Sequence, residues 1–155
     1  MASPRLRPAF LIFILASGSI LGFVAGAQEM QLQRAFPNSG GAAAWSPDGT
    51  MLATASGKNV SVLNVADGSI LWHLEGHASQ VSSISWSPDG TRLASGASDR
   101  TVRIWDVSAK TDLLNINLPD AVRSVAWSAD GRLIAAAHDN VVTVWDVASS
   151  AKAAD

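Results

Sequence analysis

His77 and Asp99 are the residues of this sequence whose types come nearest to acid–base machinery. An imidazole beside a carboxylate can take up and release a proton during a reaction. A serine hydrolase of the elbow type would also need the motif Gly-x-Ser-x-Gly, and a nucleotide enzyme would need a glycine-rich phosphate loop. The sequence contains neither motif. We therefore interpret His77 and Asp99 as structural residues and expect that the chain is not an enzyme.

The residue types and their spacing do not indicate a metal site or a cofactor site. The sequence has no cysteine, which excludes zinc–thiolate sites, cysteine nucleophiles and disulfide bonds. His73 and His138 do not stand at metal-ligand spacing with another ligand residue. The aspartates fall one to a turn and do not cluster as they do in a calcium-binding loop. We expect neither a metal nor a cofactor.

The charge balance is slightly acidic. The chain carries 11 Lys and Arg against 13 Asp and Glu, for a formal net charge of −2. Binding to nucleic acid or to anionic lipid draws on a basic surface. A solvated strand face explains the arginines of the second half, which are Arg92, Arg100, Arg103, Arg123 and Arg132. We expect no nucleic-acid partner.

A repeated segment must position these residues. Trp45, Trp86 and Trp127 lie 41 residues apart, and each begins the motif Trp-Ser-Pro-Asp-Gly, with Ala129 in place of proline in the last copy. A fixed period between about 20 and 50 residues indicates one supersecondary unit that stacks on copies of itself. The Ser-Pro-Asp-Gly segment is typical of a tight turn, because proline fixes φ and glycine accepts a left-handed position.

The segments between these turns alternate apolar and polar residues, as half-buried strands do. In the middle unit, Val102 and Ile104 share one face, and Arg103 and Trp105 share the other. We predict four strands in this unit, near residues 81–86, 92–96, 102–107 and 112–118. The first strand of each unit carries small residues on one face, which suits strands that crowd near an axis. Four-stranded antiparallel sheets repeated around an axis form a β-propeller.

Three further motifs give the repeat a family resemblance. Trp105-Asp106-Val107 and Trp145-Asp146-Val147 close two strands, and Gly76-His77 precedes the middle unit. With the Ser-Pro-Asp-Gly turns, these motifs resemble those of the WD-repeat (β-transducin-like) family over about residues 30–147. The resemblance implies an all-β propeller of three WD-type repeats within residues 28–147. It also implies a non-catalytic scaffold that binds a protein or peptide partner.

The resemblance also implies a hydrogen-bonded tetrad in each repeat, made of a His, a Ser or Thr, a turn Asp and a strand Trp. The middle unit matches at every position, with His77, Ser95, Asp99 and Trp105. The outer units match only in part. The third has Asp139 and Trp145 but Ala136 at the Ser position and Asp120 at the His position, and the first has Thr54 but Gly57 at the Asp position and Leu63-Asn64 in place of Trp-Asp.

In the WD-repeat family, partners bind the loops that join strand four to strand one and strand two to strand three. Protein or peptide contacts are therefore expected at these loops. The matching residues here are Ser79, Gln80, Ser98 and Arg100 in the middle unit, Asn38, Ser39, Ser56 and Lys58 in the first, and Asp120, Ala121 and His138 in the third.

The first 27 residues have the pattern of a signal peptide. Arg5 and Arg7 form a basic start, an apolar stretch follows, and Ala25-Gly26-Ala27 fits a small-x-small cleavage site. We expect export to the periplasm or the extracellular space, with a mature chain that begins near Gln28. The alternative is an uncleaved anchor helix, because residues 8–27 carry no charge and are about long enough to span a bilayer.

A closed propeller has about four to eight sheets, and this chain supplies three. We expect the last sheet to lack a fourth strand of its own, with residues 148–155 as a disordered tail and 141–147 as a free edge. The segment 30–36, with Leu32, Ala35 and Phe36 as its apolar residues, then completes the sheet of a second copy, and the protein is a homo-oligomer.

Two alternatives to a self-assembling scaffold stay open. The chain is either a truncated fragment of a longer WD-repeat protein or, with less support, a fragment of a quinoprotein-type propeller. The second alternative rests on Asp67-Gly68-Ser69-Ile70-Leu71-Trp72, which is similar to the hairpins of that propeller family.

Overall fold

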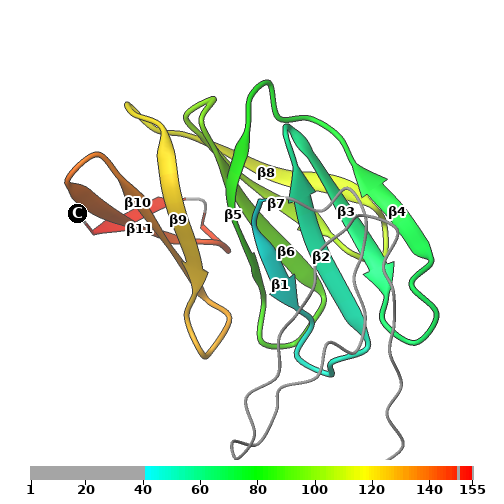
Figure 1. Ribbon diagram of the computed structural model, residues 1–155. Helices are drawn as coiled ribbons and strands as arrows, with labels where there is room; N and C mark the ends of the chain where they lie inside the picture. Colours follow the sequence, from blue (N-terminus) through cyan, green and yellow to red (C-terminus); the bar gives the residue numbers. More distant parts are fainter. Residues whose placement is uncertain (1–40, 150, 155) are drawn as a thin grey trace, which may run out of the picture. The chain divides into compact units, whose positions relative to one another are not determined.

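A computed structural model describes residues 41–149 and 151–154. These residues contain no helix and twelve β-strands, which form three antiparallel sheets of four strands each (Figure 1). The signal or anchor segment 1–27, the segment 30–36, and Asn38 and Ser39 lie outside the described residues. Within residues 41–149 and 151–154, no helix has the length and apolarity to cross a membrane.

Each sheet takes its strands in chain order, so that neighbours in sequence are also neighbours in the sheet. Sheet 1 consists of β1 (Ala43–Trp45), β2 (Met51–Ser56), β3 (Asn59–Asn64) and β4 (Ile70–Leu74). Sheet 2 consists of β5 (Val81–Trp86), β6 (Arg92–Ala97), β7 (Thr101–Asp106) and β8 (Thr111–Asn117). Sheet 3 consists of β9 (Val122–Trp127), β10 (Leu133–His138), β11 (Val141–Asp146) and β12 (Ala151–Ala154). The expected antiparallel four-stranded units are confirmed, and the strands of the middle unit fall within one residue of their predicted bounds.

The strand β12 corrects the expectation that the last sheet lacks a fourth strand of its own. It pairs with β11 opposite Val144, Trp145 and Asp146, and it uses residues that the sequence assigns to a tail. The Asp146 carboxylate accepts hydrogen bonds from Ala148 N and Ser149 N, both at 3.0 Å, which turns the chain back along the sheet. The edge 141–147 is therefore occupied over its second half and is not the vacant edge that the sequence suggests.

The three Ser-Pro/Ala-Asp-Gly segments form the same turn. In the second copy, Ser87 Oγ donates to Asp89 Oδ1 at 2.6 Å and accepts from Arg92 N at 2.9 Å. Gly90 has a φ of 71°, a left-handed value that favours glycine. Gly49 and Gly131 have the same φ. The serine hydroxyl thus fixes the turn from inside, and the sequence pattern has a simple physical cause.

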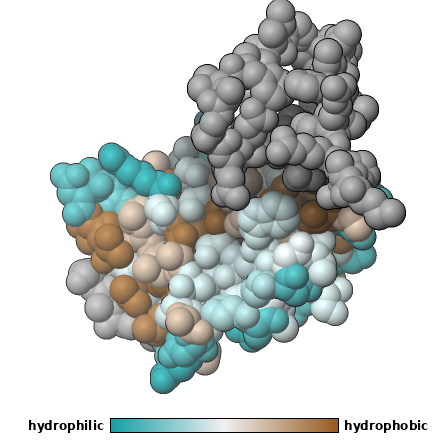
Figure 2. Space-filling view, turned by 60° about the horizontal axis from the view of Figure 1, so that its bottom comes forward, coloured by the Kyte–Doolittle hydropathy of each residue, from teal (hydrophilic) through white to brown (hydrophobic). Residues whose placement is uncertain are grey.

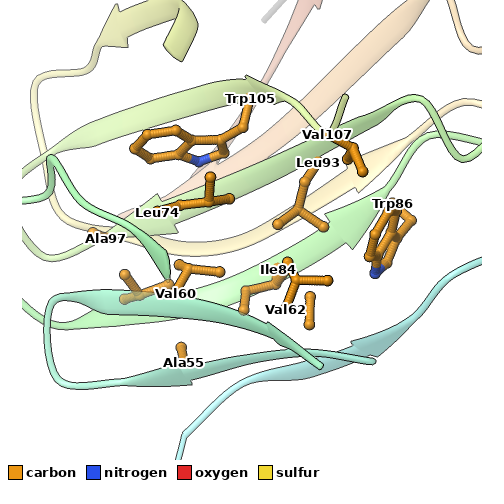
Figure 3. Packing of buried hydrophobic residues seen from close by; sticks show 12 residues of the cluster. Ala55, Val60, Val62, Leu74, Ile84, Trp86, Leu93, Ala97, Trp105 and Val107 are labelled. Carbon is orange, nitrogen blue, oxygen red and sulfur yellow. The ribbon is translucent and has the colours of Figure 1, made fainter. Parts of the chain in front are cut away.

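Two hydrophobic clusters fill the spaces between the sheets. The first lies between sheets 1 and 2 and includes Val60, Val62, Leu74, Ile84, Leu93 and Trp105 (Figure 3). The second lies between sheets 2 and 3 and includes Val102, Ile104, Ile116, Val122, Val125 and Ile134. Each of these side chains contributes about 1.5–3 kcal/mol on full burial. Sheet 2 has both faces covered in this way, because Leu93 and Trp105 lie on one face and Val102 and Ile104 on the other.

The first strands of adjacent sheets meet through small residues. Ser83 Oγ and Ser85 Oγ of β5 accept hydrogen bonds from Val125 N and Trp127 N of β9, at 3.1 and 3.4 Å. At Gly96 of β6, a Cβ atom would lie 2.5 Å from Val122 of the next sheet. Larger side chains at these positions would push the sheets apart, as the crowding argument from sequence expects.

Candidate functional site

A chain of hydrogen bonds joins four side chains of sheet 2 and the loop before it. Trp105 Nε1 donates to Ser95 Oγ at 2.8 Å, and Ser95 Oγ lies 2.8 Å from His77 Nε2. His77 Nδ1 lies 2.9 Å from Asp99 Oδ2. The structure thus brings together all four residues of the middle unit that the resemblance singles out.

The donors and acceptors fix the direction of this chain. An indole N–H can only donate, so the Ser95 hydroxyl accepts from Trp105. An ionised carboxylate can only accept, so His77 carries its hydrogen on Nδ1 and donates it to Asp99. His77 Nε2 is then free to accept the hydrogen of the Ser95 hydroxyl. The Asp99 carboxylate also accepts from Ala78 N at 2.8 Å and from Thr101 Oγ1 at 2.7 Å.

Burial and hydrogen bonding set the protonation states. Burial lowers the pKa of His77 below its usual 6.5, and the hydrogen bond and charge of Asp99 offset this effect only in part. Burial raises the pKa of Asp99, but hydrogen bonds from Thr101, Ala78 and His77 outweigh it, so that this pKa lies below 3.8. His77 is accordingly neutral and Asp99 ionised near neutral pH.

The order Ser95–His77–Asp99 is that of a hydrolase triad, but its setting differs. A nucleophilic serine must reach a substrate carbonyl. The side chain of Ser95 is completely buried, and its oxygen already accepts the Trp105 hydrogen. Asp99 Oδ2 is also engaged by the backbone of Ala78. These contacts suit a role in holding the loop before β5 against sheet 2.

Gly76 packs closely against residues of the same network. A Cβ atom at Gly76 would lie 2.8 Å from the guanidinium of Arg103 and 3.1 Å from the ring of Trp105. Arg103 lies over the Trp105 ring, at 5.8 Å from its centroid, and pairs with Asp112 of β8. The Gly-His motif therefore combines close packing at Gly76 with the hydrogen bonds of His77.

The third sheet uses a different arrangement. Trp145 Nε1 donates to Thr143 Oγ1 at 3.2 Å, and Thr143 Oγ1 lies 3.5 Å from Ala136 O. Ala136 has no hydroxyl to receive the indole, so Thr143, two residues earlier on the same strand face, takes this role. Asp139 lies in the β10–β11 turn with a φ of 43°. In the first sheet, Thr54 and Leu63 are buried without an indole at the Leu63 position.

A cavity lies where the third repeat departs from the full network. Its volume is about 490 Å³, and its lining consists of Asn117, Leu118, Pro119, His138, Val141, Thr143 and Trp145. His138 is only 4 % exposed. Neither of its ring nitrogens has a hydrogen-bond partner among the residues that the structure describes. A second cavity of about 500 Å³ is lined by Lys58 and Asn59 at the start of β3 and by Glu75, Gly76 and His77 of the loop before β5.

The loop residues expected to contact a partner mostly lie at the surface. Gln80, Ser98, Arg100, Ser56, Lys58, Asp120 and Ala121 are exposed, and Ser79 is half-buried. His138 is the exception, since it is buried beside the cavity. Within the described part of the chain, no group of three or more His, Asp and Glu residues could hold a metal ion.

Two residues of the site escaped the sequence analysis, Thr101 and Thr143, which hold the two networks in place. His138 was expected in a partner-binding loop, and the structure places it at the end of β10, where it is buried and lines the cavity. A signal for Thr101 exists, because Asp-x-Thr also occurs in the turns of Asp48 and Asp89, where Thr50 and Thr91 bond the aspartate. The cavity has no signal in the sequence, because it forms between two sheets.

Comparison with known families agrees with this geometry. The model of a family described as "WD domain, G-beta repeat" matches residues 40–64, 68–106 and 114–146, which together make up more than half of the chain. These segments cover β1 to β3, β4 to β7, and the end of β8 through β11, so that the fourth strand of one sheet is matched together with the first three strands of the next.

Curated relatives are repeat proteins of much greater length. "Periodic tryptophan protein 2 homolog" of Schizosaccharomyces pombe is 34% identical over 105 residues, 65% of this chain and 12% of that protein. "Intraflagellar transport protein 122 homolog" of Homo sapiens is 32% identical over 102 residues, 66% of this chain and 8% of that protein. "WD repeat-containing protein 1-B" of Xenopus laevis is 37% identical over 111 residues, 67% of this chain and 18% of that protein. The chain spans less than a fifth of the length of these relatives.

Proposed function

The chain belongs to the WD-repeat family, and from that premise we propose that it is a non-catalytic platform for a protein or peptide. The partner binds at the loop end of sheets 2 and 3, where the β8–β9 loop meets the β10–β11 turn. Two features support this proposal. The residues of catalytic type are engaged in the buried network, and the buried ring of His138, which has no hydrogen-bond partner among the described residues, lies beside these loops.

The observation that carries the proposal is the burial of His138 and the lack of hydrogen bonds to its ring. Buried polar groups in proteins nearly always have a hydrogen-bond partner, and leaving one unpaired costs about 1–3 kcal/mol. His138 is buried beside the cavity with both ring nitrogens unpaired within the described residues. A group that enters the cavity would supply the missing partner.

The lining of the cavity indicates the chemistry of the ligand. Leu118, Pro119 and Val141 offer apolar contacts, while His138, Thr143 and Asn117 offer hydrogen bonds, and no charged residue lines the cavity. This combination fits an uncharged segment of a peptide, in which an apolar side chain stands next to a backbone or side-chain amide.

Peptide display against the full chain tests this proposal. We expect the selected peptides to bind at least about tenfold more weakly to His138→Leu, the effect of about 1.4 kcal/mol from one lost hydrogen bond. His73→Leu is the matched control, since His73 lies on β4 away from the cavity lining and should leave binding unchanged. Equal affinity for both variants, or the failure to select any peptide, would argue against this site.

We also propose that the protein is exported and that the mature chain begins near Gln28. The support comes from the sequence of residues 1–27, with its basic start, apolar stretch and Ala25-Gly26-Ala27. Amino-terminal sequencing of the protein from a secreting host should find Gln28 or a close neighbour. Recovery of the exported protein with Met1 or Ala2 at its start contradicts cleavage, and its retention in membranes supports the anchor alternative.

A further inference from the structure

Adjacent sheets contact each other at two places in the described residues, and both contacts involve the first-strand tryptophan of the later sheet. Each sheet presents its first-strand tryptophan toward the preceding sheet. Trp86 of sheet 2 is 7 % exposed, and its Nε1 donates to Ala44 O of sheet 1 at 2.9 Å. Trp127 of sheet 3 donates from its backbone N to Ser85 of sheet 2. The indole nitrogen of Trp127 has no hydrogen-bond partner within the described part, so only the first contact uses the ring.

Sheet 1 presents the same face without a preceding sheet among the described residues. Trp45 occupies the position of Trp86, 41 residues earlier, and it is 58 % exposed. A tryptophan buries about 150–250 Å² in a protein interior or an interface, so that an exposed one on a flat strand marks an unused contact surface.

Sheet 3 presents the opposite face, and no sheet follows it among the described residues. Val60 of sheet 1 and Val102 of sheet 2 are completely buried by the sheet that follows each of them. Val142 of sheet 3 takes the same position in its repeat and is 52 % exposed. Ser124 and Ala126 correspond to Ser83 and Ser85 of β5, and both are exposed. Figure 2 shows hydrophobic surface on the left, the side on which β9, β10 and β11 lie in Figure 1.

We propose that two copies of this chain close one ring head to tail, with the Val142 face of each copy docked on the Trp45 face of the other. The sequence repeat predicts which groups form hydrogen bonds across this interface. By the 41-residue offset, Ala126 O corresponds to Ala44 O and would accept the indole hydrogen of Trp45. Ser124 Oγ corresponds to Ser83 Oγ and would accept the backbone hydrogen of Ala43.

The proposed number of copies rests on the three sheets of the described residues. Two copies give six sheets, within the range of about four to eight in propellers, while three copies would give nine. Head-to-tail contacts close into a ring when the rotation allows it. This arrangement joins whole sheet faces, and it does not require the segment 30–36 to add a strand to the edge that β12 occupies in part.

Light scattering on the full chain and its variants tests the ring. We expect twice the mass of one chain for the native protein, and the mass of one chain for Trp45→Arg and for Val142→Arg. Both residues are exposed in the single copy, so these variants should keep the circular dichroism spectrum of the native fold. Leu113→Arg is the matched control, because Leu113 is 50 % exposed on β8 and lies on neither docking face.

A mixing experiment tests the head-to-tail geometry itself. Trp45→Arg keeps an intact Val142 face, and Val142→Arg keeps an intact Trp45 face, so an equimolar mixture should recover dimers through one native interface. A native protein that is monomeric at all concentrations, a mixture that stays monomeric, or a Leu113→Arg variant that dissociates equally would overturn the proposal. Peptide binding at the His138 cavity is measured on the same monomeric variants, so that the two proposals can fail separately.

Discussion

At the scale of single residues, the buried network of sheet 2 shows how one exchange of a side chain changes the whole arrangement. Ser95 receives the indole hydrogen in sheet 2, and Ala136 at the same position in sheet 3 cannot do so. Thr143 receives it instead. Buried polar groups are usually hydrogen-bonded, and Thr143 on the same strand face provides the acceptor for Trp145.

The first prediction compares Trp105→Ala with Leu63→Ala, the same strand position in two repeats. Trp105→Ala should lower the free energy of unfolding by about 3–5 kcal/mol through lost packing, and it leaves Ser95 short of a partner, which costs about 1–3 kcal/mol more. Leu63→Ala should only open a cavity. Urea denaturation of both variants measures the difference, and equal losses would show that the hydrogen bond to Ser95 adds nothing.

The second prediction concerns pH and the protonation of His77. Its pKa in the folded protein lies below 6.5, so that the unfolded chain binds more protons between these two values. Stability should therefore fall as the pH drops below about 6.5 and should be fully present above it. Asp99 adds a second loss below 3.8, because its folded pKa is also lowered.

Imidazole NMR and denaturation at several pH values check this prediction. We expect the His77 ring to gain its proton only below the usual imidazole pKa of 6.5. His77→Asn should flatten the dependence of stability on pH between 7 and 5, while His73→Asn should preserve it. If the dependence of stability on pH is unchanged in His77→Asn, another titratable group causes the loss of stability at low pH.

The tetrad positions could be named from sequence because each is tied to a motif of fixed spacing. His77 follows Gly76, Asp99 lies in the turn between two strands, and Trp105 begins Trp-Asp. The state of His138 could not be predicted in the same way. Its burial depends on the distance between Leu118 and Val141, which belong to different sheets, and no pattern within one repeat encodes that distance.

At the scale of elements, the turns determine the sheets more strongly than strand propensity does. The strands of sheet 2 were predictable to within one residue, and Ser-Pro-Asp-Gly and Trp-Asp mark the ends of β5 and β7. Residues 151–154 consist of Ala and Lys, which are depleted in strands, so that composition gave no reason to expect β12. The turn after Asp146 positions this strand, in the same way that Asp106 bonds Ala109 N before β8.

The third prediction tests this role of the turns. Ala129 stands where the first two turns have Pro47 and Pro88, and no hydrogen bond of the Ala129 N–H occurs among the described turn contacts. Ala129→Pro should raise the free energy of unfolding by about 0.4–1 kcal/mol, because it restricts the unfolded chain. Pro88→Ala is the converse control and should lower stability by a similar amount. Thermal denaturation that finds Ala129→Pro destabilised would show that the third turn differs from the other two.

At the scale of the whole molecule, the three sheets are not equivalent, because within residues 41–149 and 151–154 only sheet 2 is packed on both faces. The hydrophobic cluster of sheet 1 covers one side of it, and that of sheet 3 covers the other. Sheets 1 and 3 each keep one face that carries an exposed large side chain, Trp45 or Val142. The repeat was visible in the sequence, but the unequal burial of its copies depends on which faces have a neighbour.

The last prediction follows from this inequality and concerns native-state hydrogen exchange. Local opening requires the least free energy where few apolar contacts hold an element, so that β6 and β7 should exchange most slowly and β1 and β11 fastest in dilute protein. Raising the concentration should slow exchange in β1, β9 and β11 if a second copy covers their faces, because binding stabilises the bound state by mass action. Trp45→Arg should abolish that dependence on concentration and leave β6 and β7 protected. If all three sheets exchange at the same rate in the dilute variant, an uncovered face does not lower the local stability of a sheet. That result would contradict the proposal that two copies associate to cover these faces.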